Sequence, residues 1–209
     1  MGSEGAEFTP TFMAGLPLAS AALAFARQQH EGQRRRLDAA PFILHPLEVA
    51  ALLFNSGHAE PVVAAAILHD TVEDTAVGLD EIGERFGGEV ARLVAAVTED
   101  AEIEDRAERK AALRRQVAEA GPEASSIYAA DKVTKVRELR GRLTIDPVLL
   151  DRDPDAQLRL EHYRESLLML EEMAPDHPQV RQLRFELEAL RGLPPSPGGL
   201  SPAPGGGRL

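Results

Sequence analysis

Two histidines and two aspartates, each within an apolar helical pattern, are the residues of this chain most suited to metal chemistry. His45 precedes a proline that fits the first turn of a helix, and the pair His69-Asp70 ends the apolar stretch 62–68. Asp131 lies on the border of another apolar helix face. Because the chain has no cysteine, imidazole and carboxylate groups are its only candidate ligands. This mixed nitrogen and oxygen set favours Mn²⁺, Fe²⁺, Co²⁺ or Zn²⁺ over Mg²⁺.

Two more carboxylates follow the His-Asp pair. If the helix continues for one more turn, Glu73 shares the face of His69 and Asp74 shares that of Asp70. Carboxylates crowded in a semi-apolar setting repel one another unless a cation compensates them, so the crowding supports a metal site. A carboxylate beside the ligands can orient water or protonate a leaving oxygen, the roles that we predict for Glu73 and Asp74. A His-Asp dipeptide alone also arises by chance, and lone histidines are often structural.

A basic connector, Gln33-Arg34-Arg35-Arg36, follows the first helical segment. An acidic chain that binds a small anion needs a local basic pocket, and the guanidinium groups of Arg35 and Arg36 could supply it. A solvated surface cluster is the alternative for such a run.

Composition limits the partners and the fold. The net charge of −11 disfavours a nucleic-acid groove, which needs a basic face. With 209 residues, 4% aromatic residues, no Trp and recurrent Ala and Leu, we expect one all-α domain. The first 17 residues do not resemble a secretory signal, and the longest clean apolar stretch is too short to span a membrane. We therefore expect a cytoplasmic protein with no membrane partner, and homo-oligomer formation stays open.

Apolar residues at helical spacing fill the middle of the chain. The expected organisation is a flexible segment over 1–16, one helical domain over 17–191 and a disordered Pro/Gly-rich tail over 192–209. The highly charged stretch 102–120 predicts an exposed helix or a partly mobile segment. Helices are predicted over 18–29, from Pro46, from Pro61, and over 79–86, 89–98, 123–139, 157–173 and 178–191.

Five ordered blocks resemble the HD hydrolase domain of Rel/SpoT-type alarmone enzymes, especially the stand-alone small alarmone hydrolases. The blocks are HEGQ at 30–33 with Arg35-Arg36, PFILHPLEVA at 41–50, AAILHDTVEDT at 65–75, FGGEV at 86–90 with Val97-Thr98, and AADK at 129–132. The resemblance implies a compact all-α phosphohydrolase that removes the 3′-diphosphate of ppGpp or pppGpp, giving GDP or GTP and pyrophosphate. It implies one Mn²⁺ ion per chain, with Glu73 and Asp74 assisting the chemistry and Arg35 and Arg36 at base-contacting positions. The implied ligands are His45, His69, Asp70 and Asp131.

Two departures from the family pattern fall near the expected nucleotide site. The loop reads LDAA at 37–40, where the family tends to have a Ser/Gly-containing turn, and Lys135 replaces a usual Asn four residues after Asp131. Lys132 and Lys135 are candidate phosphate contacts, although a lysine lacks the donor and acceptor pair of an amide. Two alternatives stay open: an HD phosphohydrolase acting on NADPH or another phosphorylated nucleotide, and a non-catalytic alarmone-binding module. The intact Glu73-Asp74 pair disfavours the second.

The other histidines have modest expected roles. His30, near the Gln33 turn, is expected to make a structural hydrogen bond, and His162 is expected at the surface.

Overall fold

The computed structural model describes residues 9–191, and this part of the chain is helical, as the sequence predicts. Its single isolated β-bridge, between Arg34 and Pro41, closes the loop before α2. The elements are η1 (Thr11–Met13), α1 (Pro17–Gln29), α2 (Leu44–Asn55), α3 (Glu60–Leu68), α4 (Thr71–Asp74), α5 (Leu79–Phe86), α6 (Gly88–Val97), α7 (Arg106–Ala120), α8 (Pro122–Ile145), α9 (Leu149–Arg152), α10 (Pro154–Met173) and α11 (Pro178–Arg191).

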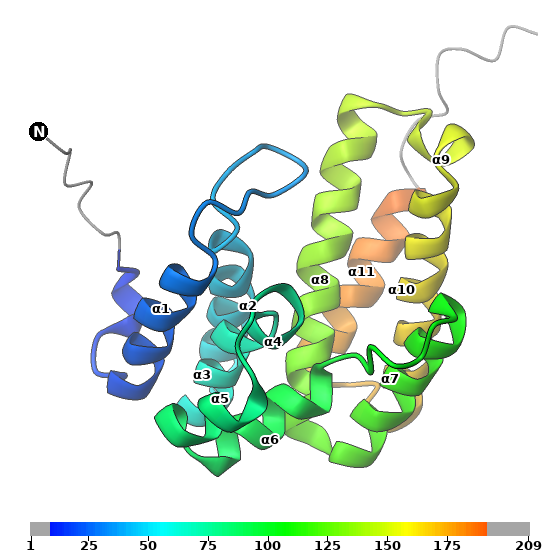
Figure 1. Ribbon diagram of the computed structural model, residues 1–209. Coiled ribbons are helices and arrows are strands. Elements are labelled where there is room, and N and C mark those ends of the chain that lie inside the picture. The colour runs from blue at the N-terminus through cyan, green and yellow to red at the C-terminus, as the bar shows by residue number, and fades with distance from the viewer. Residues whose placement is uncertain (1–8, 192–209) are drawn as a thin grey trace, which may run out of the picture.

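The long helix α8 runs through the middle of the molecule, with α1–α6 on one side and α7 and α9–α11 on the other (Figure 1). It contacts α2, α3 and α6 on the first side and α7, α10 and α11 on the second. Gly121 turns the chain with φ +95°, and Pro122 then occupies the first turn, where its missing N–H is not needed. A residue on α8 can therefore face either group of helices.

The helix α8 extends beyond the predicted end at residue 139. Leu139 and Leu143, one turn apart, continue its buried face. Gly141 does not stop the helix, because its bare backbone lies against Leu37: a Cβ there would lie 3.3 Å from Leu37 Cδ2. The loop before α2 thus packs on the last turns of α8.

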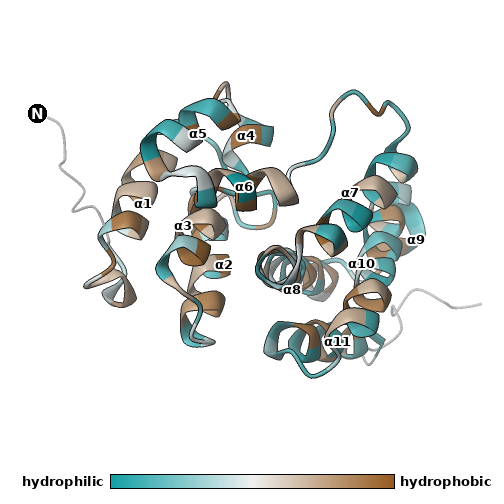
Figure 2. Cartoon of the chain, turned by 90° about the horizontal axis from the view of Figure 1, so that it is seen from below, coloured by the Kyte–Doolittle hydropathy of each residue, from teal (hydrophilic) through white to brown (hydrophobic). Residues whose placement is uncertain are grey.

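The helix α3 is the centre of the first group. All residues from Val62 to Leu68 are buried, and the helix packs against α1, α2 and α6. Small alanine side chains allow this close approach, so the end of α3 reaches the middle of the protein. In the view from below, hydrophilic residues colour much of α5 and α7, at the periphery (Figure 2).

The charged stretch forms the ordered helix α7. Asp105 caps it by accepting a hydrogen bond from the Glu108 N–H, and Leu113 and Val117 are buried. The helix α7 packs against α6, α8 and α10. Of the two alternatives predicted for this stretch, a helix or a partly mobile segment, the structure has the helix.

The predicted terminal segments are only partly described. Within the expected flexible segment 1–16, Thr11–Met13 forms a short helix that buries Met13. Residues 1–8 and the predicted tail 192–209 lie outside the described part, so the domain boundaries at 17 and 191 stay predictions. Among the described helices, none is long and apolar enough to cross a membrane.

Candidate metal centre

Three helices bring the predicted histidines and Asp131 together. His45 lies in the first turn of α2, His69 follows the end of α3, and Asp131 lies in α8. One ligand atom from each of these three buried residues lies within 4.8 Å of the others. His45 Nε2 is 3.1 Å from Asp131 Oδ1, and His69 Nε2 is 3.6 Å from the same oxygen.

The opposite ring nitrogens fix how the two imidazoles face this centre. Thr134 Oγ1 donates to the Asp131 carbonyl at 2.8 Å, so it accepts from His45 Nδ1–H at 3.2 Å. His69 Nδ1–H donates to the Ala66 carbonyl at 2.8 Å. Both Nε2 atoms therefore offer lone pairs to the centre, the usual arrangement for metal-binding histidines.

These residues fit a divalent ion. Within residues 9–191 no hydrogen bond is formed by the two buried Nε2 atoms or by Asp131 Oδ1, a cost that proteins rarely leave uncompensated. Metal–ligand bonds of about 2.1 Å place neighbouring donor atoms about 3.0–3.4 Å apart; His45 Nε2 and Asp131 Oδ1 have this separation, and His69 Nε2 lies slightly farther from Asp131 Oδ1, at 3.6 Å. Asp70 also approaches, with carboxylate oxygens 3.2 Å from each Nε2 atom.

Two lysines and the imidazole of His45 lie against the buried carboxylates and balance their charge. Burial opposes ionisation of Asp131, but Lys132 and Lys135 outweigh it and hold its pKa well below the usual range. Lys132 Nζ lies 2.6 Å from Asp131 Oδ2, and Lys135 Nζ lies 2.9 Å from Oδ1. Burial lowers the pKa of His45, yet the carboxylates of Asp131 and Asp70 raise it to about 9. A metal ion would therefore replace a proton at His45 and compete with Lys135 for Asp131.

The two carboxylates that follow Asp70 differ in position. The predicted extra turn exists as the separate helix α4, and Glu73 lines a small cavity with His69, Asp70 and Asp131. Glu73 Oε1 accepts from the Glu99 N–H at 2.6 Å. Desolvation raises the pKa of Glu73 despite this hydrogen bond. Desolvation and the charge of Asp70 likewise raise the pKa of Asp74, which is exposed, as Glu73 is, but does not line that cavity.

A cavity of about 470 Å³ between α7, α8 and α10, here called the cationic cleft, adjoins the metal centre. Lys110, Lys132 and Lys135 line both this cleft and the small cavity that contains Glu73. Cations outnumber carboxylates along its walls. The lining residues are Asp105, Arg106, Ala107, Lys110, Lys132, Lys135, Leu158, Arg159, Glu161, His162, Tyr163 and Glu165.

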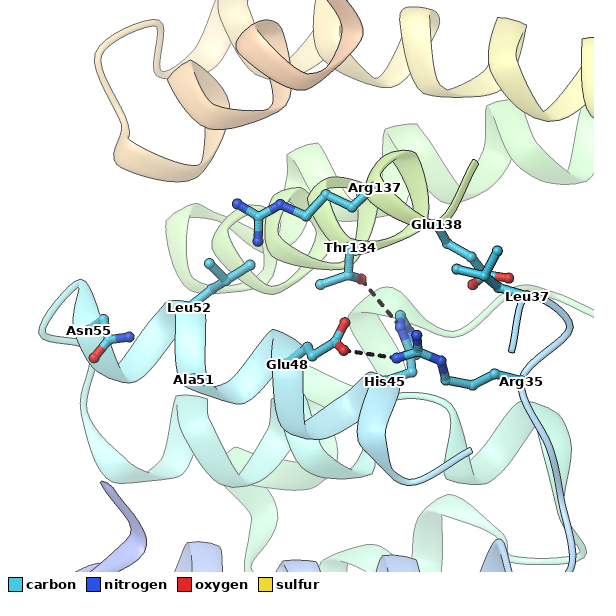
Figure 3. Close-up of a pocket in the computed structure, with 10 residues that line it drawn as sticks. All are labelled: Arg35, Leu37, His45, Glu48, Ala51, Leu52, Asn55, Thr134, Arg137 and Glu138. Carbon is cyan, nitrogen blue, oxygen red and sulfur yellow. Dashed lines mark hydrogen bonds and ion pairs between the residues drawn. The ribbon is translucent and has the colours of Figure 1, made fainter. Parts of the chain in front are cut away.

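A second cavity of about 430 Å³, here called the arginine pocket, lies behind His45 between α2, α8 and the loop 33–41. Arg35 lines it and pairs with Glu48 at 2.8 Å (Figure 3). Asp38 holds the same guanidinium at 2.9 Å. Arg36 is exposed on the same loop. The lining residues are Arg35, Leu37, His45, Glu48, Ala51, Leu52, Asn55, Thr134, Arg137 and Glu138.

Comparison with known proteins agrees with this geometry. The family model described as HD domain matches residues 22–152. The chain belongs to the HD domain family. The all-α HD fold and a buried His/His/Asp metal cluster, both predicted from the sequence, are thereby confirmed.

The HD-domain relatives include proteins named for alarmone hydrolysis. The chain is 40% identical over 118 residues to the human guanosine-3′,5′-bis(diphosphate) 3′-pyrophosphohydrolase MESH1, a match that covers 55% of this chain and 65% of that protein. A pyrophosphohydrolase of the same name from Aquifex aeolicus is 36% identical over 117 residues, covering 55% of this chain and 17% of the relative. The chain thus spans less than two thirds of the length of these relatives.

A solved structure has the same fold over most of this HD-domain chain. It is described as a metazoan ortholog of SpoT that hydrolyses ppGpp and plays a role in starvation responses. It superposes with a TM-score of 0.71 and 25% identity, covering 89% of this chain and 99% of that one.

The structure tests the predictions for His30 and His162 and adds two residues that no motif indicated. The hydrogen bond expected for His30 exists, from its Nδ1 to Gln33 Oε1 at 2.8 Å. The surface position expected for His162 is wrong: its side chain is buried, near Tyr128 and Arg114. Arg159 and Tyr163 had no assigned role, because only the packing of α10 beside α8 brings them to the cleft.

Proposed function

We propose that this protein is a metal-dependent hydrolase that removes the 3′-diphosphate of ppGpp or pppGpp. The observation that carries the proposal is the convergence of three buried ligand atoms from His45, His69 and Asp131, with Glu73 at the edge of this cluster and a cationic cleft beside it. The relatives named as 3′-pyrophosphohydrolases support the choice of reaction.

Asp70 is the proposed fourth ligand, and Mn²⁺ is the proposed ion. Two imidazoles and two carboxylates form a mixed donor set that suits Mn²⁺ better than the all-oxygen shell that Mg²⁺ prefers. When bound, the ion would lower the pKa of a water molecule and draw charge from a phosphate oxygen.

The other residues divide the chemistry and the binding. Glu73 is the proposed base: its raised pKa makes it a better proton acceptor than a free carboxylate, and it lies in the small cavity beside the ligands. Water attacks the phosphorus that is bonded to the 3′-oxygen, the bond between these two atoms breaks, and the water oxygen leaves in pyrophosphate. The 3′-oxygen takes a proton, for which Asp74 with its raised pKa is the proposed donor.

Lys132 and Lys135 are the proposed phosphate contacts, and the cationic cleft is the proposed site of the second diphosphate. Lys132 is buried over the Tyr128 ring at 4.2 Å, so it acts from a fixed place. The base is proposed to stack at Arg35, whose guanidinium two carboxylates hold in place, with Arg36 adding a solvent-exposed charge to the loop.

The test is pyrophosphate release from ppGpp by the purified protein, first stripped with a chelator and then loaded with Mn²⁺, Zn²⁺ or Mg²⁺. We expect rapid release with Mn²⁺ and almost none from the Asp70→Ala and Glu73→Gln variants. NADPH is the parallel substrate, because a cationic cleft also suits its phosphates. Phosphate release from NADPH alone would replace the substrate and keep the site; an unchanged Glu73→Gln rate would reject the assigned base.

A further inference from the structure

One carboxylate of the arginine pocket has no partner. Glu138 lies on α8 two turns after Asp131, is half-buried and lines the pocket. Among residues 9–191 nothing donates a hydrogen bond to it or forms an ion pair with it. Neighbouring charges in the pocket are already engaged: Arg35 pairs with Glu48, and Arg137 pairs with Glu186 at 2.7 Å. A half-buried carboxylate facing a cavity is a free hydrogen-bond acceptor.

The pocket walls suit a flat ring. Leu37, Ala51 and Leu52 supply apolar surface, and Leu37 is held against α8 by its close contact with Gly141. Two carboxylates hold the Arg35 guanidinium, which gives a planar group on which a ring can stack (Figure 3). Glu138 extends from α8 at the end of the pocket where Leu37 and Arg35 also lie (Figure 3).

The helix α8 sets the order of the three sites. Asp131 faces the metal centre, Lys132 and Lys135 face the cationic cleft, and Thr134 and Glu138 face the arginine pocket. His45 forms a wall shared by the metal centre and the pocket. A nucleotide with its reacting phosphate at the metal and its other phosphates among the lysines would therefore extend its base toward Glu138.

We propose that Glu138 determines base specificity by accepting hydrogen bonds from N1–H and the 2-amino group of a guanine. This inference rests on the proposed function, because it requires a nucleotide at the metal centre. Hypoxanthine offers only N1–H to the carboxylate. Adenine presents an unprotonated N1, whose lone pair the carboxylate repels. The carboxylate thus favours guanine, which offers it two hydrogen-bond donors, and disfavours adenine, which presents an acceptor at N1.

The first test is equilibrium binding of GDP, IDP and ADP to the Mn²⁺-loaded protein. We expect GDP to bind about tenfold more tightly than IDP and about 100-fold more tightly than ADP. In Glu138→Gln the affinity for GDP should fall about 30-fold, while that for ADP should rise, because the carboxylate that repels adenine N1 is gone. Glu172→Gln, an exposed glutamate of α10, is the matched control and should keep the wild-type order. An unchanged preference for GDP in both Glu138→Gln and Glu138→Ala would overturn the proposal.

The second test separates this inference from the proposed reaction. The 3′,5′-bis(diphosphates) of guanosine, inosine and adenosine differ only in their bases, so their kcat/KM values should follow the same order in the wild type and converge in Glu138→Gln. A preference for GDP that depends on Glu138, without hydrolysis of ppGpp, would retain the inference and reject the reaction. If both Glu138 variants hydrolyse ppGpp with the wild-type base preference, the proposed reaction is retained and the role of Glu138 is rejected.

Discussion

The metal centre and the cationic cleft share one face of α8, yet their charges are arranged in opposite ways. At the metal centre, Asp70 and Asp131 converge and Glu73 lies close by, so negative charge dominates there. In the cleft, Arg106, Lys110 and Arg159 join the lysines of α8, so positive charge dominates. Lys132 and Lys135 belong to both. Such an arrangement can hold a cation and a polyanion side by side, because each lowers the cost of the other.

The largest expected effect tests the chemical half of this comparison. Replacing Glu73 with Gln keeps the shape and the hydrogen bond to the Glu99 N–H but removes the base, so kcat should fall about 10³-fold. KM and the affinity for Mn²⁺ should change little, because the ligands and the cleft are untouched. Steady-state kinetics and metal titration measure the three quantities; a large rise in KM would instead place Glu73 among the substrate contacts.

The next prediction tests whether the cationic cleft binds the substrate. Arg159→Ala removes one cation from the cleft, and we expect KM for ppGpp to rise about tenfold while kcat stays within about twofold. Arg181→Ala, an exposed arginine of α11 that does not line the cleft, is the matched control. Equal KM values for the two variants would remove the cleft from substrate binding.

The sequence predicted the metal centre better than it predicted the cationic cleft. The ligands His45, His69 and Asp131 lie in contiguous motifs on apolar helices, so local pattern and resemblance together were enough to place them at one site. Arg159 and Lys110 belong to no motif, because only the packing of α7 and α10 beside α8 brings them to the cleft. The buried position of His162 was missed for that reason: its own helix is charged on most faces, and the burial comes from α7 and α8.

Replacing Lys135, which both regions share, should strengthen binding instead of weakening it. Its ammonium group is 2.9 Å from Asp131 Oδ1, so it competes with a metal ion for that oxygen. Lys135→Asn should therefore bind Mn²⁺ about tenfold more tightly, since a nearby positive charge is removed. Calorimetric titration of the metal-stripped protein measures this without any substrate. Weaker Mn²⁺ binding in the variant would mean that Lys135 supports the ligands and does not oppose the ion.

The smallest effect uses His162 as a probe of positive charge in the cleft. Burial, together with the charges of Lys132 and Lys110, lowers the pKa of His162 to about 2. The folded protein thus keeps this imidazole neutral, whereas the unfolded chain protonates it below about pH 6.5. Protonation then favours the unfolded state, so stability is lost as the pH falls. Between pH 7.5 and 5.5 this residue alone should lower the free energy of unfolding by about 1.4 kcal/mol.

Denaturant unfolding of the wild type and of His162→Gln at both pH values isolates this contribution. The variant should be less stable than the wild type at pH 7.5, because it disturbs the contacts to Arg114 and Tyr128, but its stability should fall less on acidification. The difference between the two pH dependences, and not the stability at either pH, reports the field of the lysines. If the two pH dependences coincide, the imidazole is not held neutral, and the cleft is less positive than its lining residues imply.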